Sequence, residues 1–174
     1  MNYLKAYHFI NDYKKGEINN LDKKINIIYR NNNKTIKERD LINIRDECNK
    51  TGNKLYVSNN FTLAIKLKLK GVYLPSFNKS LKIKSISNKK LDIIGSAHNL
   101  KQIRIKEKQG ARCIFLSPIF KTKKNPNYLD IYRFNNLSKL SKKKIVALGG
   151  INKINLNRLK FVKCEGYASI TYLK

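Results

Sequence analysis

The chain of 174 residues is poor in acidic side chains, in cysteine and in long apolar runs. Its 3 cysteines form no CxxC pair, which argues against a disulfide framework and against a zinc site. No apolar run approaches the roughly 18 residues that a membrane span needs. The first residues also lack the apolar core and the cleavage site of a signal peptide. We therefore expect a cytoplasmic protein that makes no use of a membrane.

The 11 acidic residues face 38 lysines and arginines, which gives a formal net charge of +27 at pH 7. Such a charge makes nucleic acid a partner to consider. Arginine, which reads bases through paired hydrogen bonds, is rare here, and lysine supplies most of the charge. The basic residues are spread along the chain rather than gathered in one tail. We expect non-specific adhesion to polyanions at low salt but no specific nucleic acid.

One stretch shows the pattern on which the fold prediction rests: it runs from Ala111 to Lys124 and reads ARCIFLSPIFKTKK. The apolar run at 113–116 predicts a strand that is buried on both faces. Pro118 ends regular pairing, because proline has no N–H to donate. Threonine and lysines follow, so hydroxyl and ammonium groups stand together in the loop after a buried strand. Such a loop suits an anion such as phosphate, although lysine runs are usually solvated.

Seven further apolar runs alternate with helical patterns. The eight expected strands cover residues 7–10, 25–30, 54–58, 71–74, 91–94, 113–116, 145–148 and 166–170. The expected helices cover residues 19–24, 35–49, 61–70, 81–87, 100–109, 134–143 and 155–162. Thr35, Asn99 and Asn155 stand where they can cap three of these helices. This alternation predicts parallel strands joined by right-handed crossovers.

Eight such units predict an α/β protein, a compact (β/α)8 TIM barrel that residues 1–174 form as one domain. An open doubly wound sheet is the alternative. The chain is short for a barrel, for which about 250 residues are typical. It stops at Lys174, soon after the eighth strand, so we expect the last helix to be missing. Tyr29, Tyr56 and Tyr73 alternate with apolar residues and are expected to fill the barrel.

Polar residues follow the expected strands, at the ends where a barrel builds its active site. Gly149 and Gly150 would let a bare backbone approach a phosphate, or would simply form a tight turn. We expect Gly150→Val to block a phosphate without loss of folding if φ is negative at that position. The other residues at strand exits are Arg30, Asn31, Lys34, Asn59, Asn60, Ser76, Asn78, Ser96, His98, Thr122, Lys123, Lys124, Ser169 and Thr171.

Six segments at these exits read, in chain order, IYRNNNK, KLYVSNN, GVYLPSFN, GSAHN, LSPIFKTKK and IVALGGI. In order and spacing they resemble the motifs of the thiamine phosphate synthase and TenI superfamily. The resemblance covers about residues 3–172. It implies a phosphate-binding (β/α)8 barrel. Synthases of this family join a hydroxymethylpyrimidine diphosphate to a thiazole phosphate and expel pyrophosphate with magnesium.

The resemblance also implies roles for individual residues. It implies catalytic roles for Ser96, His98 and Lys124, with Asn125 as the alternative to Lys124 if the loop carries a one-residue gap. The substrate-binding residues that it implies are Arg30, Lys34, Asn59, Thr122, Gly149, Gly150, Ile170 and Thr171.

The two magnesium-binding aspartates of the family fall on Asn60 and Asn78. Magnesium usually takes one or two carboxylates together with substrate phosphates, and an amide carbonyl brings no charge. We therefore expect magnesium, the cofactor that the resemblance implies, to matter less here than in a relative with both aspartates. Lysines would then neutralise the pyrophosphate directly.

Three functions stay open at this point. The first, which we expect to be the function, is thiamine phosphate synthesis from small phosphorylated pyrimidine and thiazole substrates. The second is a TenI-like thiazole tautomerase in which His98 shuttles a proton, since imidazole exchanges protons near neutral pH. The third is a non-catalytic module that binds a phosphorylated ligand. A lone histidine is more often structural, and the sequence also leaves open whether the chain forms a homo-oligomer.

Overall fold

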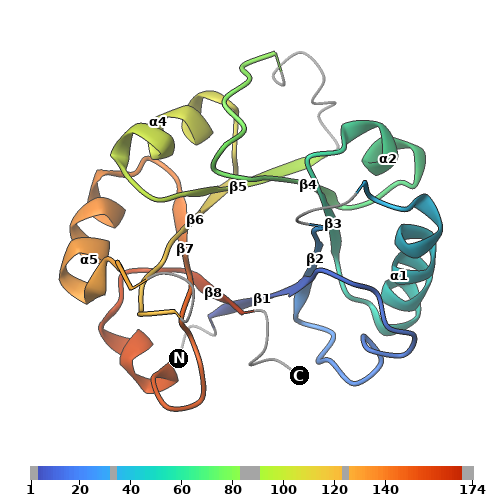
Figure 1. The fold of residues 1–174 in the computed structure, drawn as a ribbon, viewed down its shortest axis with the longest axis horizontal. Coiled ribbons are helices and arrows are strands. Elements are labelled where there is room, and N and C mark those ends of the chain that lie inside the picture. The colour runs from blue at the N-terminus through green and yellow to red at the C-terminus, as the bar shows by residue number, and fades with distance from the viewer. Residues whose placement is uncertain (1–3, 32–34, 83–90, 123–125, 170–174) are drawn as a thin grey trace.

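The computed structural model describes residues 4–31, 35–82, 91–122 and 126–169. Eight parallel strands close into a barrel in chain order, and β8 pairs with β1 (Figure 1). This closure confirms the predicted (β/α)8 barrel and excludes the open sheet. The strands are β1 Lys5–Ile10, β2 Asn26–Tyr29, β3 Leu55–Ser58, β4 Gly71–Leu74, β5 Asp92–Ala97, β6 Cys113–Leu116, β7 Lys144–Leu148 and β8 Gly166–Ser169.

Helices surround the barrel on its outer side in Figure 1. They are α1 Glu38–Thr51, α2 Phe61–Lys66, α4 Leu100–Lys108, α5 Asp130–Leu140 and the 3₁₀ helix η1 Leu156–Phe161. Asn99 caps α4 as predicted, because its side chain accepts a hydrogen bond from the backbone N–H of Gln102. Residues 15–20 form turns, so the helix expected at 19–24 is wrong. The helix expected at 81–87 falls largely outside the described residues.

Helix boundaries differ from the predicted ones for local reasons. α1 begins at Glu38 without a side-chain cap, so Thr35 does not cap it. α2 ends at Lys66, because Lys68 adopts the left-handed conformation with φ of 52°. α5 begins at Asp130 rather than at Phe134, and the Asp130 carboxylate accepts a hydrogen bond from the backbone N–H of Arg133.

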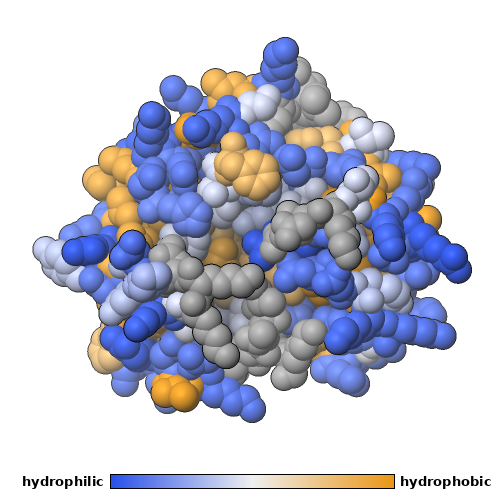
Figure 2. Space-filling view, in the orientation of Figure 1, coloured by the Kyte–Doolittle hydropathy of each residue, from blue (hydrophilic) through white to orange (hydrophobic). Residues whose placement is uncertain are grey.

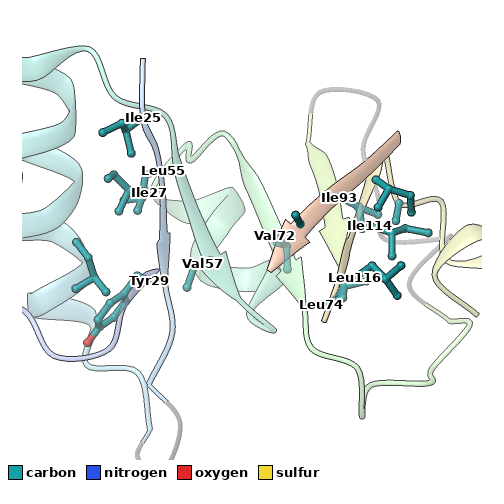
Figure 3. Packing of buried hydrophobic residues seen from close by; sticks show 14 of the residues in the cluster. Ile25, Ile27, Tyr29, Leu55, Val57, Val72, Leu74, Ile93, Ile114 and Leu116 are labelled. Atoms are coloured by element: carbon teal, nitrogen blue, oxygen red, sulfur yellow. The ribbon is translucent and has the colours of Figure 1, made fainter. Parts of the chain in front are cut away.

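The barrel wall separates two apolar layers, because successive side chains of a strand point to opposite faces. The outer layer packs under the helices, and Figure 3 shows Ile27 and Tyr29 pointing from β2 towards α1. The inner layer includes Tyr56 and Tyr73, as predicted. Tyr29 does not fill the barrel, since its neighbour Ile28 takes the inward position on β2.

Four aromatic rings close the middle of the barrel. Tyr7, Phe9, Tyr73 and Phe115 meet edge to face, with ring centroids 4.9 Å apart in the closest pair and 6.1 Å in the widest. Such arrangements stabilise beyond the area that they bury. This aromatic plug divides the barrel interior into a space at the carboxyl ends of the strands and a space at their amino ends.

Tyr7→Phe should gain stability relative to the wild type as the pH rises above 10. Burial raises the pKa of Tyr7 above its ordinary value of 10.0, because an ionised phenol is poorly solvated in the barrel. The unfolded chain releases this proton first, so Tyr7 makes the wild type lose more stability than the variant does as the pH rises. Chemical denaturation should show the difference growing by about 1.4 kcal/mol per pH unit. Tyr132→Phe, at an exposed position, is the control; a constant difference for Tyr7→Phe would contradict this account.

The outer surface is strongly polar. Hydrophilic residues cover most of the face shown in Figure 2. Within the described ranges, every helix is too short or too polar to span a bilayer.

Candidate active site

A cavity of about 210 Å³ opens among the carboxyl ends of the strands, above the aromatic plug. Barrels bind their ligands at this end, because the loops after the strands converge there. Three residues for which the family resemblance implies a role, Arg30, Ser96 and His98, line this cavity. The rest of its lining consists of Asn31, Ser58, Tyr73, Pro75, Ser76, Phe77, Ser117 and Leu148.

Arg30 supplies the positive charge of this cavity. Its backbone N–H donates to the Ile10 carbonyl over 2.8 Å, and its Nε donates to the Asn11 Oδ1 over 3.4 Å. The guanidinium carbon lies 4.7 Å from the centroid of the Phe9 ring, which is a cation–π geometry. Among the residues that the structure describes, no carboxylate forms an ion pair with Arg30. The guanidinium is therefore oriented by neutral groups and keeps its charge for an anionic ligand.

Tyr73 and Ser96 form the polar part of the cavity floor. Burial raises the pKa of Tyr73, while hydrogen bonds with the side chains of Ser96 and Arg30 act in the opposite direction. The phenol therefore stays protonated at neutral pH. Ser96 is only 5% exposed, so its hydroxyl is positioned by the barrel wall rather than by solvent. The floor thus offers two hydroxyl groups next to one guanidinium.

His98 stands at the mouth of the cavity in a fixed orientation. Its Nδ1 lies 2.7 Å from the carbonyl oxygen of Ser117 and 3.2 Å from the Ser117 hydroxyl. A carbonyl oxygen can only accept, so Nδ1 carries the proton and Nε2 of the neutral ring is left as an acceptor. The backbone N–H of His98 also donates to the Gln102 side chain over 2.8 Å. His98 can therefore receive a proton at Nε2.

Three asparagines gather beside the cavity, at the ends of β3 and β4. Asn59 adopts φ of 55°, and its side-chain oxygen accepts a hydrogen bond from the Asn78 amide. The Asn60 side chain caps α2 by accepting from the backbone N–H of Leu63 over 2.9 Å. The Asn78 oxygen accepts from the backbone N–H of Ser80 over 3.0 Å. All three amide oxygens already have hydrogen-bond donors.

These asparagines do not suit a magnesium ion. They carry no charge and their oxygens are engaged, whereas magnesium takes carboxylates with substrate phosphates. In the described part of the chain, no three His, Cys, Asp or Glu side chains form a group that could hold a metal.

Lys106 fixes the loop after β4, a role that no sequence motif indicates. Its side chain is completely buried, and Nζ donates to the carbonyls of Pro75 and Asn78 over 2.8 and 2.7 Å. Nζ also donates to the Gln109 side chain over 3.0 Å. Gly95 makes room for it, since a Cβ there would lie 2.8 Å from the Lys106 Cδ. Lys106 therefore holds in place the loop that forms one wall of the cavity.

Gly149 and Gly150 bring the end of β7 against the loop after β6. Their φ angles are 94° and 72°, in the left-handed region that favours glycine. A Cβ on Gly150 would lie 2.5 Å from the Phe120 carbonyl oxygen. The condition for a harmless Gly150→Val is therefore not met, and this substitution would damage the fold.

Gly150→Ala should destabilise the protein more than Gly110→Ala does. Both positions have positive φ, but a Cβ on Gly110 meets nothing within 4 Å. The two variants therefore share the backbone strain and differ in the contact with Phe120. Chemical denaturation should place Gly150→Ala at least about 1 kcal/mol below Gly110→Ala. Equal stabilities would mean that the Gly150 backbone is not pressed against the loop after β6.

The chain matches the family model for thiamine monophosphate synthase over residues 22–173. It belongs to the thiamine monophosphate synthase family. A candidate thiamine-phosphate synthase of Aquifex aeolicus is 32% identical over 125 residues, which cover 68% of this chain and 67% of that relative. The thiamine-phosphate synthase of Methanococcus vannielii is 29% identical over 119 residues, which cover 67% of this chain and 57% of the relative.

A solved structure supports the same architecture for this member of the thiamine monophosphate synthase family. The thiamine phosphate pyrophosphorylase from Pyrococcus furiosus superposes with a TM-score of 0.78 and 22% identity. The superposition covers 98% of this chain and 87% of that protein. At this identity the comparison shows the fold, and the predicted family resemblance is confirmed by the match to the family.

The remaining predicted residues of this thiamine monophosphate synthase family member lie in three different situations. Asn59 and Gly149 directly follow Ser58 and Leu148, which line the cavity. Asn60, Asn78, Gly150 and Thr122 lie outside its lining. Lys34, Lys124, Ile170 and Thr171 fall outside the described residues. The prediction missed Tyr73, Ser117 and Lys106, of which Tyr73 alone carried a signal, as a tyrosine on a barrel strand.

Proposed function

We propose that the chain is a thiamine-phosphate synthase, which joins hydroxymethylpyrimidine diphosphate to thiazole phosphate and releases pyrophosphate. One observation carries this proposal. Arg30, Tyr73 and Ser96 meet in one cavity at the ligand-binding end of a barrel of the thiamine monophosphate synthase family. A cation and two hydroxyl groups suit a substrate with a charged diphosphate and a polar ring.

In this reaction the bond between a pyrimidine CH₂ carbon and the diphosphate oxygen breaks. The electron pair leaves with pyrophosphate, and the thiazole nitrogen then forms a bond to the carbon. The protein has to position both substrates and stabilise the departing negative charge. Arg30 would receive the pyrophosphate, because its guanidinium has no carboxylate partner among the described residues. Tyr73 and Ser96 would orient the pyrimidine on the cavity floor.

The thiazole phosphate would bind at the exits of β7 and β8. Gly149 and Gly150 are partly exposed, and Gly149 directly follows Leu148 of the cavity lining. Glycine allows a phosphate to approach the backbone closely. Contributions from Lys34, Lys124, Ile170 and Thr171 stay predictions from the family resemblance.

A tautomerase is the second candidate, and the geometry of His98 favours it. The Ser117 carbonyl fixes the Nδ1 proton, so Nε2 can take a proton from a carbon of the thiazole and return it at another atom. This activity needs the thiazole phosphate alone. A member that binds the phosphorylated ligands without turnover is the third possibility.

Three measurements on the wild type separate these functions. Mixing both substrates should release pyrophosphate if the chain is a synthase. Proton exchange from solvent into thiazole phosphate, without the pyrimidine, would indicate the tautomerase. Thermal stabilisation by the ligands without either reaction would indicate the binding module and would overturn the proposal.

Removal of magnesium by EDTA should lower the rate of pyrophosphate release by less than about tenfold. The reason is that Asn60 and Asn78 offer engaged, uncharged oxygens where the family has aspartates. Asn60→Asp and Asn78→Asp together should raise the affinity for magnesium, measured by calorimetry in the presence of pyrophosphate. Complete loss of turnover in EDTA, with no gain in metal affinity from the aspartates, would contradict this reading.

A further inference from the structure

A second cavity, of about 270 Å³, lies at the opposite end of the barrel, among the amino ends of the strands. Its rim is strongly basic. Lys5, Lys54, Lys70, Arg112 and Lys144 stand at or directly before the starts of five strands. Lys23 and Lys24, from the turn before β2, complete a ring of seven cations, which we call the basal ring.

Among the described residues, two carboxylates form ion pairs with three cations of the basal ring. Asp92 at the start of β5 pairs with Lys70 over 3.4 Å and with Arg112 over 3.0 Å. Glu165 pairs with Lys144 over 2.7 Å. Lys5, Lys23 and Lys54 have no ion pair with any described carboxylate. At least three cations around one hollow, Lys5, Lys23 and Lys54, therefore keep a positive charge that no described ion pair compensates.

The floor of this basal cavity is apolar and closed. The aromatic plug begins here, with Tyr7 packed against Phe115 at a centroid distance of 4.9 Å. Tyr7 and Tyr56 line the cavity but are only 6% and 4% exposed. A charged cleft with low-dielectric walls focuses the field and concentrates counter-ions. The plug also separates the basal cavity from the candidate active site.

We infer that the basal ring binds a small multivalent oxyanion of the phosphate type, such as an inorganic oligophosphate. Lysine ammonium groups bind phosphate as point charges, and several of them converge on this one cavity. The site suits a small anion better than single-stranded nucleic acid. Binding of a strand relies on exposed aromatic rings on which bases stack, and here both tyrosine rings are buried.

The test titrates the whole protein with inorganic triphosphate in about 150 mM salt, where diffuse attraction to the surface is largely screened. Backbone-amide NMR locates the site and calorimetry measures the affinity. The variant is Lys5→Gln/Lys54→Gln, whose two side chains are exposed. The matched control is Lys101→Gln/Lys139→Gln, which removes the same charge from exposed positions on α4 and α5 outside both cavities.

Triphosphate should shift the amide signals at Lys5, Asn26 and Lys54. The affinity of this site should fall at least about tenfold in the Lys5/Lys54 variant and less than about twofold in the control. Arg30→Met, which changes the other cavity, should leave the affinity of the basal ring for triphosphate unchanged. ATP serves as a second probe: equal affinity means that the phosphate chain alone is recognised, and higher affinity means that the natural anion is a nucleotide. Both results support the site.

Three results would overturn the inference. The first is a set of shifts confined to the active-site cavity around Ser96 and His98. The second is an equal loss of affinity in both double variants, which would show bulk charge only. The third is an oligothymidylate that binds at the basal ring more tightly than triphosphate, which would make nucleic acid the ligand. Thermal denaturation of each variant tests whether the variant is folded. If the Lys5/Lys54 double variant is not folded, Lys54→Gln alone takes its place.

Discussion

Arg30→Met should lower kcat/KM for pyrophosphate release by about 100-fold or more. Removal of one group that stabilises charge in the transition state typically costs two to three orders of magnitude. Arg30 is the cation of the cavity lining, and the described residues offer no second one there. Methionine keeps much of the contact with Phe9, so the fold should survive. Steady-state assays that detect pyrophosphate give the measurement.

Arg45→Met is the matched control for this loss. Arg45 is a half-buried residue of α1 that pairs with Asp46 over 2.7 Å, and it makes no contribution to the cavity. Its replacement changes the net charge by the same amount and should leave kcat/KM within about twofold of the wild type, as surface ion pairs contribute little. Similar losses in both variants would show that Arg30 acts only through the overall charge.

Lys106→Met should destabilise the protein by about 2 kcal/mol or more, because lost hydrogen bonds outweigh a relieved burial penalty. Burial lowers the pKa of Lys106 from 10.5 to about 8, which corresponds to roughly 3 kcal/mol against the charged form. Its three hydrogen bonds come from a charged donor, and each such bond is worth about 1.5–3 kcal/mol. Methionine would leave the carbonyls of Pro75 and Asn78 without this donor and would free the wall that they form. The free energy of unfolding, measured by chemical denaturation, and kcat/KM should therefore both fall. We expect kcat/KM to fall by about tenfold or more.

Lys108→Met tests whether this effect belongs to the buried contacts. Lys108 lies two residues further along α4 and is exposed, so its replacement removes the same charge from the same helix. It should change the free energy of unfolding by less than about 0.5 kcal/mol. Equal stability of the two variants would contradict the role of Lys106 in holding the loop after β4.

The barrel could be predicted because its signals are local. Most strands are short apolar runs between turn residues, as at Cys113–Leu116, and most are followed by a helical pattern. It was harder to predict which residues of a strand face the barrel interior and which face the helices, because the whole run is apolar. Tyr29 was placed inside because nothing in the sequence marks whether it or Ile28 faces inward. Only the register with β1 and β3 settles this choice.

The candidate site could be predicted only in part. Arg30, Ser96 and His98 were found because they directly follow or end strands, where a barrel must place them. Lys106 could not be found, because a lysine in a helix is normally solvated. Its burial depends on the absence of a side chain at Gly95, on a different element. Asn60 was predicted at a metal position, and its place directly before α2 is also the place of an N-cap, which is how the structure uses it.

The most direct test of the proposed function is the identity of the product. The wild type, incubated with hydroxymethylpyrimidine diphosphate and thiazole phosphate, should form thiamine phosphate and pyrophosphate in equal amounts, as quantified by mass spectrometry and a pyrophosphate assay. Arg30→Met should form both about 100-fold more slowly. Recovery of both substrates unchanged, from protein that binds them, would contradict the account.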